Sequence, residues 1–399
     1  MYDRPGPQAA FAQWTDACAR AGWRAGPAAV RVERVALADA LGRVSAAPVA
    51  ARWPSPRADC AAMDGIAIKA EEADIVRHRF PAAMFAWIDT GDPMPDGTDT
   101  VVMREHVTID SAGGALVDGS VNVSAGRHVR KQGEDFAAGA VLVPPGRRLG
   151  PADLAVAAAA GHTSLAVARK PLVAIIPTGD EIRGADIGAE HLRRGDIIDS
   201  NSVYLAARCA RAGAATAVSD VIPDDPDRLA AELRRAAGGA DLVLVIAGSS
   251  RGRGDHTAAV LAQVGGVAVA GVAVRPGHPA LLGHAKAPSD TTIPVVGLPG
   301  YPIATAVTFE LFAAPVLALL QGDETPRRTR PARLAADWTS THDVEEWVPV
   351  SLSPDGDATP TGHGAGSTSQ LARADAWWPI SAAAHHFTAG ARITVIPWY

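Results

Sequence analysis

The chain has 399 residues, with 37 basic and 43 acidic side chains and a formal net charge of −6. Its length is typical of about two to four domains. A hydrophobic fraction of 48% with 20% charged residues indicates a globular rather than a disordered chain. The mild acidity, without any stretch rich in lysine and arginine, argues against a partner that is a nucleic acid.

Cysteine usage and apolar segments indicate the compartment. Cys18, Cys60 and Cys209 lie far apart and never form a C-x-x-C pair, which argues against a disulfide framework and a zinc–thiolate site. The first twenty residues hold no apolar segment of the secretory kind, and the most apolar run, near residues 154–160, is too short to span a bilayer. We therefore expect a cytoplasmic protein with no membrane partner.

The sequence pattern changes twice within the first 171 residues. Residues 13–50 carry a helical pattern, in which valines such as Val30, Val35 and Val44 recur near one face. Residues 53–149 instead hold short β-like runs separated by turn residues, for example at 65–68, 84–88 and 100–103. An alanine-rich helix is then predicted from Pro151 to Gly161, followed by a short strand.

From residue 172 to 320, continuous apolar strands alternate with helices. Strands are predicted at 172–176, 241–247 and 293–298, and helices at 201–212, 227–237, from 257 and at 303–320. This alternation is typical of a parallel sheet covered by helices on both faces. Ligands of such sheets bind beyond the carboxyl ends of the strands, so the loops after Ile176, Ala247 and Leu298 are the candidate site.

Two of these loops carry residues suited to anions and metals, and each has a plain structural alternative. In Thr178-Gly179-Asp180-Glu181 the paired carboxylates suit Mg²⁺, or they cap a helix and oppose its dipole. The loop at 248–257 has three glycines, two serine hydroxyls and two guanidinium groups, which suit an oxyanion site, or it is an ordinary flexible loop. Asp255 could bind a metal or cap the following helix.

Rigid turns and a lone aspartate complete the set of candidates. Arg275-Pro276-Gly277-His278-Pro279 and Leu298-Pro299-Gly300-Tyr301-Pro302 are turns whose proline and glycine fix the backbone. Asp64 precedes Gly65 just before a β-like run, a pair that by itself indicates only a turn.

Taken in chain order, these segments resemble the motifs of the molybdopterin molybdenumtransferases, the family of MoeA and the gephyrin E-domain. The resemblance runs through nearly the whole chain, and the matching segments lie at 40–44, 62–67, 90–95, 99–103, 133–135, 178–181, 224–225, 248–255, 275–279 and 298–302.

The resemblance implies an α/β multidomain fold. Its parts would be a helical domain (1–50 and 145–171), an inserted β-rich domain (51–144), a doubly wound, parallel-sheet domain similar to MogA that binds molybdopterin (172–324), and a C-terminal β-barrel (325–399). It also implies a homodimer, with the active site between the doubly wound domain of one subunit and the β-rich domain of the other, and a molybdopterin adenylyltransferase as partner.

The reaction implied is the Mg²⁺-dependent insertion of molybdate or tungstate into adenylylated molybdopterin, with release of AMP. Because both substrates are anions, such a site needs amides, hydroxyls and cations, with a metal to neutralise charge on the phosphates. By position, the resemblance gives catalytic roles to Asp64, Glu181, Asp224 and Asp255, with Glu181 and Asp255 as metal ligands. It gives substrate-binding roles to Thr90, Asp135, Thr178, Gly248, Ser249, Ser250, Arg275, His278, Pro299 and Pro302.

Several positions depart from the family pattern. Ala61 replaces a usual serine, Arg275 and His278 replace two lysines, and Ala304 replaces a serine, although Thr305 is adjacent. Arginine stays a permanent cation with geometry suited to oxyanions, whereas histidine is only partly charged near pH 7. The predicted catalytic carboxylates match the family pattern, whereas the residues predicted to bind the oxyanion differ from it. The sequence therefore supports cleavage of the phosphoanhydride better than it supports a choice between molybdate and tungstate.

Two other functions stay open at this point. The doubly wound domain is shared with molybdopterin adenylyltransferases, although that activity alone would not need the β-rich segments on either side. A non-catalytic carrier or scaffold would bind molybdopterin, or a partner protein, without releasing AMP.

Overall fold

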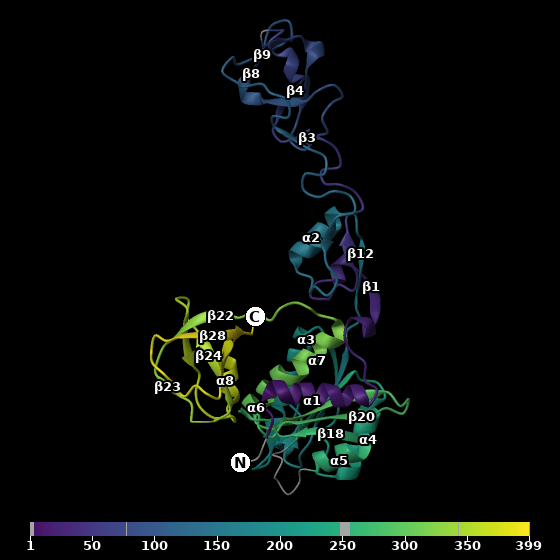
Figure 1. The fold of residues 1–399 in the computed structure, drawn as a ribbon, viewed down its shortest axis with the longest axis vertical. Helices are drawn as coiled ribbons and strands as arrows, with labels where there is room; N and C mark the ends of the chain where they lie inside the picture. The colour runs from purple at the N-terminus through teal and green to yellow at the C-terminus, as the bar shows by residue number, and fades with distance from the viewer. Residues whose placement is uncertain (1–3, 77, 248–255, 342, 399) are drawn as a thin grey trace. The chain divides into compact units, whose positions relative to one another are not determined.

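The computed structural model describes residues 4–76, 78–247, 256–341 and 343–398 (Figure 1). It divides into two compact units, one of residues 1–33 with 168–399 and one of residues 34–167. The two units do not follow the four predicted domains one by one, so those boundaries stay a prediction. Each unit is described by itself.

The larger unit is built on a six-stranded sheet in the order β16-β13-β17-β21-β20-β18. Its first four strands are parallel, which confirms the doubly wound sheet. Its strands are β13 (Leu172–Pro177), β16 (Ala215–Val218), β17 (Leu242–Ala247), β18 (Gly265–Ala270), β20 (Leu281–Lys286) and β21 (Thr292–Pro299).

The other edge of this sheet is antiparallel, which corrects the expectation of a wholly parallel sheet. β20 pairs antiparallel with both β21 and β18. Only residues 287–291 connect β20 to β21. Since a parallel connection needs a crossover of a dozen or more residues, so short a loop allows only a hairpin.

Helices cover both faces of the sheet. Alternate residues of each strand point to opposite faces, so each face has its own apolar core. Val173 and Ile175 of β13 belong to one apolar core, and Ala174 and Ile176 to the other. The helices are α1 (Pro7–Arg20), α3 (Ser200–Arg211), α4 (Pro226–Ala237), α5 (Thr257–Val264), α6 (Pro302–Thr308) and α7 (Ala314–Gln321). The predicted helices of this region are therefore confirmed.

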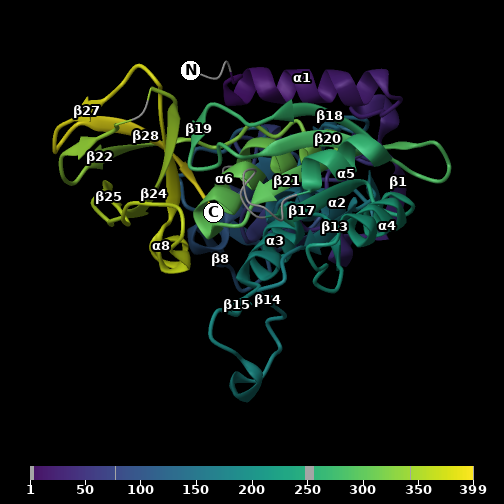
Figure 2. The same cartoon turned by 90° about the horizontal axis from the view of Figure 1, so that it is seen from below.

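Helix α1 packs on this sheet rather than joining the segment that follows it (Figure 2). Its buried residues Ala10, Trp14 and Cys18 recur every four positions on one face. The Trp14 indole N–H donates to the Gly283 carbonyl of β20 over 2.6 Å.

The helical pattern predicted to continue through residues 30–44 is wrong. Val32–Ala36 forms strand β1, which pairs with β12 (Ser164–Ala168). Closely spaced valines at 30, 32 and 35 are β-branched, and such side chains pack better on a pleated surface than on a helix.

The smaller unit is rich in short strands, as the turn-punctuated sequence predicts. Two three-stranded sheets, β6-β4-β7 and β5-β9-β8, share an apolar core that includes Ile66, Phe80 and Val102. Its elements are β2 (Val49–Ala50), β3 (Cys60–Ala61), β4 (Gly65–Ile68), β5 (Arg79–Phe80), β6 (Ala86–Ile88), β7 (Thr100–Met103), β8 (Val107–Ile109), β9 (Ala115–Val117), β10 (Val129–Arg130), β11 (Val141–Val143) and α2 (Pro151–Ala159).

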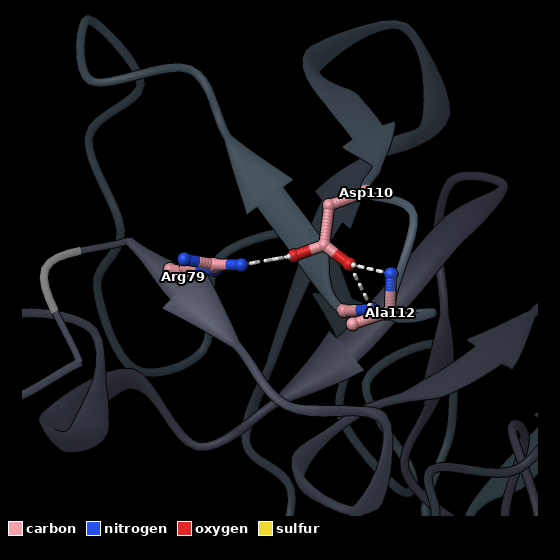
Figure 3. A network of polar contacts seen from close by, with 4 residues as sticks. Arg79, Asp110 and Ala112 are labelled. Carbon is pink, nitrogen blue, oxygen red and sulfur yellow. Dashed lines mark hydrogen bonds and ion pairs between the residues drawn. The ribbon is translucent and has the colours of Figure 1, made fainter.

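One carboxylate organises the β8–β9 turn of this unit (Figure 3). Asp110 accepts hydrogen bonds from the backbone N–H groups of Ala112 (2.8 Å) and Gly114 (2.9 Å), and from the Arg79 guanidinium of β5 (2.8 Å). The Gly114 N–H, followed by Arg79, holds the pKa of the Asp110 carboxyl below its usual range. The same side chain therefore closes the turn and ties it to the neighbouring strand.

The last part of the chain forms the expected β-barrel. Five strands, in the order β24-β25-β22-β28-β26, close into a ring through the β24–β26 pairing. They are β22 (Arg330–Leu334), β24 (Glu345–Leu352), β25 (Asp357–Pro360), β26 (Ala376–Ile380) and β28 (Arg392–Pro397), with β23 (Trp338–Thr339), β27 (His386–Phe387) and α8 (Thr368–Arg373) beside them.

The tryptophans of the barrel strands belong to two different cores. Trp378 lies in the barrel core with Val348 and Val350. Trp347 and Trp377 are also buried, but they face outward and join the core shared with the sheet and its helices. These outward-facing indoles fasten the barrel to the doubly wound part of the same unit.

A buried carboxylate secures the segment between the last helix and the barrel. Glu310, in a π-helical turn (Phe309–Ala313) between α6 and α7, accepts from the Arg208 guanidinium of α3 and from Arg327 over 2.7 Å. Arg327 precedes β22, and its guanidinium lies 5.5 Å from the centre of the Trp347 ring. One acid therefore holds the sheet's helices and the barrel's leading segment together.

The same long helix, Pro302–Gln321, is apolar and long enough to cross a membrane by length and composition alone. Its most apolar stretch is 67% buried inside the protein. A buried core helix has the same composition, so this feature by itself is weak evidence of a membrane span.

Replacing Glu310 tests the role of this ion-pair cluster. In Glu310→Ala, two guanidinium groups lose their shared partner, which we expect to lower the free energy of unfolding by about 2–3 kcal/mol. Urea denaturation followed by tryptophan fluorescence measures it, with Glu324→Ala, an exposed acid in the same region, as the control. An equal midpoint in both variants would show that the cluster does not stabilise the fold.

Candidate functional site

The larger unit contains a cavity of about 1170 Å³ between the carboxyl edge of the sheet and the barrel. Loops after β13 and β21 form one wall, and β24 with residues 362–366 contributes to the other. Six of the predicted site residues line this cavity: Thr178, Glu181, Arg275, His278, Pro299 and Pro302.

The loop after β13 is built by its own hydrogen bonds. The Thr178 backbone N–H and hydroxyl both donate to the Ile246 carbonyl of β17, over 3.0 and 2.9 Å. Gly179 has a φ of 134°, which other residues rarely adopt, and a Cβ there would lie 2.8 Å from the Ile182 Cγ1, so this position favours glycine. Thr178 therefore positions the loop, and the Glu181 side chain is exposed at the cavity.

The two acids of this loop do not cap a helix, which removes the structural alternative for them. A short strand, β14 (Ile182–Arg183), follows directly. Asp180 instead accepts from the Asp224 backbone N–H over 3.1 Å, which brings the Asp224 loop beside the β13 loop. Asp224 itself does not line the cavity.

The turn after β21 is held from three sides. The Asn201 amide of α3 donates to the Gly300 carbonyl over 2.7 Å, and the Ile303 backbone N–H donates to Ala365 of the barrel over 3.0 Å. The buried Thr305 hydroxyl donates to the Pro299 carbonyl over 2.5 Å. Thr305 is therefore engaged inside its own turn and does not replace the serine hydroxyl missing at position 304.

The turn that carries Arg275 and His278 is continuous with the barrel. Val274–Arg275 forms β19, which pairs with β24 so that Arg275 lies opposite Glu346. Gly277 has a φ of 117°, and a Cβ there would lie 3.2 Å from the Thr308 hydroxyl. Arg275 and His278 are both exposed and line the cavity.

Four predicted residues, Gly248, Ser249, Ser250 and Asp255, lie outside the described residues. The strand that leads to them, β17, ends at the same sheet edge as β13 and β21. Within the described residues no group of three or more histidine, cysteine or carboxylate side chains is arranged to hold a metal ion. Glu181 is thus the one predicted metal ligand that the structure describes.

The remaining predicted residues belong to the smaller unit. Asp64 accepts from the Thr90 backbone N–H and from the Thr90 hydroxyl, each over 2.7 Å. These two bonds hold the pKa of the exposed Asp64 carboxyl below its usual range, so Asp64 is a carboxylate at neutral pH. Asp135 is exposed, and its backbone N–H donates to Ser55 over 3.0 Å.

Sequence reasoning missed the residues that the barrel contributes. Trp338, Glu346 and His363 all line the cavity, and Asn201 fixes the turn after β21. None of the barrel residues belongs to a motif or follows a strand of the main sheet. Only the β19–β24 register brings Glu346 beside a predicted residue.

Three family models match successive parts of the chain. The MoeA N-terminal region (domain I and II) matches residues 10–161, the probable molybdopterin binding domain residues 174–319, and the MoeA C-terminal region (domain IV) residues 331–398. The molybdopterin molybdenumtransferase of a Nostoc species is 32% identical over 73% of this chain and 70% of its own length. Molybdopterin molybdenumtransferase 2 of Mycobacterium tuberculosis is 32% identical over 78% of this chain and 81% of its own.

The chain belongs to the MoeA family. The crystal structure of a MoeA molybdopterin biosynthesis protein from Pyrococcus horikoshii superposes with a TM-score of 0.81 at 27% identity, over 100% of both chains. The predicted fold class, a doubly wound domain with β-rich parts and a C-terminal barrel, is thereby confirmed.

The Asp64–Thr90 pair gives a test by titration. Thr90→Val keeps the backbone bond but removes the hydroxyl bond, so the pKa of Asp64 should rise toward its ordinary value without reaching it. A carboxyl group whose pKa is lower in the folded state stabilises the fold at pH values above its unfolded pKa, and this stabilisation is lost as the pH falls through the folded pKa. Because the folded pKa of Asp64 is higher in the variant, the variant should lose this stabilisation at a higher pH than the wild type. Carboxyl ¹³C NMR measures the titration.

Thr98→Val is the control for this titration, because the Thr98 hydroxyl donates to the Pro95 carbonyl in the same unit. The pKa of Asp64 should be the same in this control as in the wild type. A Thr90→Val protein in which it is also unchanged would contradict the assignment.

Proposed function

We propose that this protein inserts molybdate or tungstate into adenylylated molybdopterin, with Mg²⁺ and with release of AMP. The observation that carries the proposal is the cavity at the sheet's carboxyl edge, which gathers Thr178, Glu181, Arg275 and His278. Family membership supports it, since relatives with this domain series are named molybdopterin molybdenumtransferases.

The charges at the cavity suit a bound polyanion. Arg275 is a permanent cation whose guanidinium can bind phosphate or an oxyanion through two parallel hydrogen bonds. His278, three residues away on the same turn, adds a second nitrogen donor. We infer that this turn binds the phosphates or the metal oxyanion.

The fit to Mg²⁺ rests on the chemistry of the donors. Proteins usually hold Mg²⁺ through one or two carboxylates, with water and substrate phosphates completing the shell. Glu181 is exposed on a loop that hydrogen bonds fix in place, and we propose that it holds the ion together with Asp255. When bound, Mg²⁺ neutralises charge on the phosphates during cleavage of the phosphoanhydride.

In this proposal Asp64 is a carboxylate that orients the nucleophile, because its lowered pKa keeps it charged and makes it a weak proton acceptor. Both Thr90 donors bind the same oxygen of its carboxylate, Oδ1. Oδ2 is left to orient a water molecule or the substrate. We further propose, from the family resemblance, that the protein acts in the cytoplasm as a homodimer and receives its substrate from a molybdopterin adenylyltransferase.

AMP release is the direct test of the proposal. The protein should release AMP from adenylylated molybdopterin only with Mg²⁺, and molybdate or tungstate should stimulate the release. The oxyanion that stimulates it, and that activates an apo-molybdoenzyme with the product, is the physiological one. Tight binding without release under any condition would instead support a carrier or scaffold.

Two carboxylate variants test the site itself. Glu181→Gln and Asp64→Asn should each slow AMP release about a hundredfold or more, because each loses a charge that holds the metal or orients the nucleophile. Glu190→Gln, an exposed acid beyond the cavity, is the control and should keep wild-type activity. Full activity in both site variants would show that the reaction takes place elsewhere.

A further inference from the structure

The mouth of the barrel opens onto the cavity and carries an acid on its inner face. Glu346 alternates along β24 with Val348 and Val350, which belong to the barrel core, so its side chain shares their inward direction. Trp338 is another member of this core that also lines the cavity. Burying a carboxylate among apolar side chains costs free energy unless the carboxylate finds a partner. The mouths of barrels are common ligand sites.

Polar atoms at this mouth lack partners within the described part of the chain. The Glu346 Oε2 and the Trp338 indole Nε1 are both buried without a hydrogen bond. Glu345, next along the strand and facing the other way, instead accepts from the Trp347 indole over 2.6 Å. Because nearly all buried polar atoms in proteins are paired, the Glu346 oxygen is suited to a donor that arrives with a ligand.

A flat ring surface lies beside this acid. The His363 imidazole stacks on the Trp338 indole, with ring centres 4.4 Å apart and planes 7° apart. Trp338 is buried beneath it, whereas His363 is exposed and lines the cavity. The two rings therefore offer an aromatic face at the same wall as Glu346.

The loop that carries His363 is fixed before any ligand binds. The Gln370 amide donates to the His363 carbonyl over 2.9 Å. Gly362 has a φ of 148°, and a Cβ there would lie 3.0 Å from the Gln370 amide group. The Ala365 carbonyl accepts from Ile303 of α6. A pre-organised ring surface of this kind binds a flat ligand at a low cost in entropy.

We propose that Glu346 and the His363–Trp338 stack form the subsite for the pterin ring of the substrate, an inference that rests on the proposed function. The aminopyrimidinone edge of a pterin presents two adjacent N–H donors, which one carboxylate can accept in parallel. The base-pairing edge of adenine pairs one donor with one acceptor, so adenine matches this acid less well. The ring face stacks on His363.

The position of Arg275 agrees with this division of the cavity. Arg275 lies directly opposite Glu346 in the β19–β24 register, on a neighbouring strand about 4.8 Å away. Within the described residues the Glu346 Oε2 has no hydrogen-bond partner, so it is not bound to Arg275. The cation thus remains for the phosphates while the acid binds the ring.

The test is fluorescence titration of the full chain with three probes. They are 6-hydroxymethylpterin, 6-hydroxymethyllumazine, in which an oxo group replaces the 2-amino group, and AMP. The wild type should bind the pterin about tenfold or more tightly than the lumazine, because only the pterin edge offers two donors to Glu346. Equal affinity for the two pteridines would overturn the proposal.

Variants assign the preference to the acid. Glu346→Gln, of the same shape, should weaken pterin binding about tenfold or more, remove the preference over lumazine and leave AMP affinity within about twofold. Glu345→Gln on the opposite face of the same strand is the matched control and should bind all three probes as the wild type does. His363→Ala should weaken both pteridines, and His363→Phe should restore them.

These outcomes separate the two proposals. If the wild type releases AMP but Glu346→Gln binds pterin normally, the subsite is wrong and the proposed function stands. If the pterin preference depends on Glu346 and no AMP is released, the subsite stands and the proposed reaction is wrong. Equal loss of pterin and AMP in Glu346→Gln would show a general disturbance of the cavity and would overturn the subsite.

Discussion

The shape of the cavity depends on a buried acid that is not part of it. Glu310 accepts hydrogen bonds from Arg208 on α3 and from Arg327 on the segment that leads into the barrel. The surrounding helix forms a π-helical turn at this point, a feature that is rare and often found near functional sites. Together with the β19–β24 pairing, this ion-pair cluster keeps the barrel at the carboxyl edge of the sheet, and the cavity is the space enclosed between them.

The two walls of the cavity differ in chemistry, and this difference is the basis for proposing a substrate with two different ends. The sheet side supplies Arg275, His278 and the Glu181 carboxylate, which are groups for phosphates, an oxyanion and a metal ion. The barrel side supplies an aromatic stack and an acid, which are groups for a flat ring with N–H donors. Arg275 and His278, where the family resemblance leads one to expect lysines, both lie on the first wall.

The sequence predicted those features whose signal is local. Apolar runs of strand length identified β13, β17 and β21, and the loops after β13 and β21 proved to line the cavity. Features decided by pairing were missed. The valine pattern predicts a helix face, but Val32 and Val35 lie in strand β1, and the short β20–β21 loop imposes an antiparallel edge.

The barrel side of the site could not have been predicted in this way. Glu346 reaches the cavity because of its register opposite Arg275, some seventy residues earlier in the chain, and His363 because Trp338 and Gln370 hold it there. No spacing within the sequence reports such contacts. The family motifs predict site roles for Asp64 and Thr90, and the hydrogen bonds between these two residues became visible only in the structure.

We propose that this cavity holds adenylylated molybdopterin, and a crystal structure of the full chain with that compound and Mg²⁺ is the decisive measurement. We expect the pterin ring against His363 and Glu346, the phosphates at Arg275 and the metal ion at Glu181. Substrate density at any other place, with the cavity left to solvent, would contradict it.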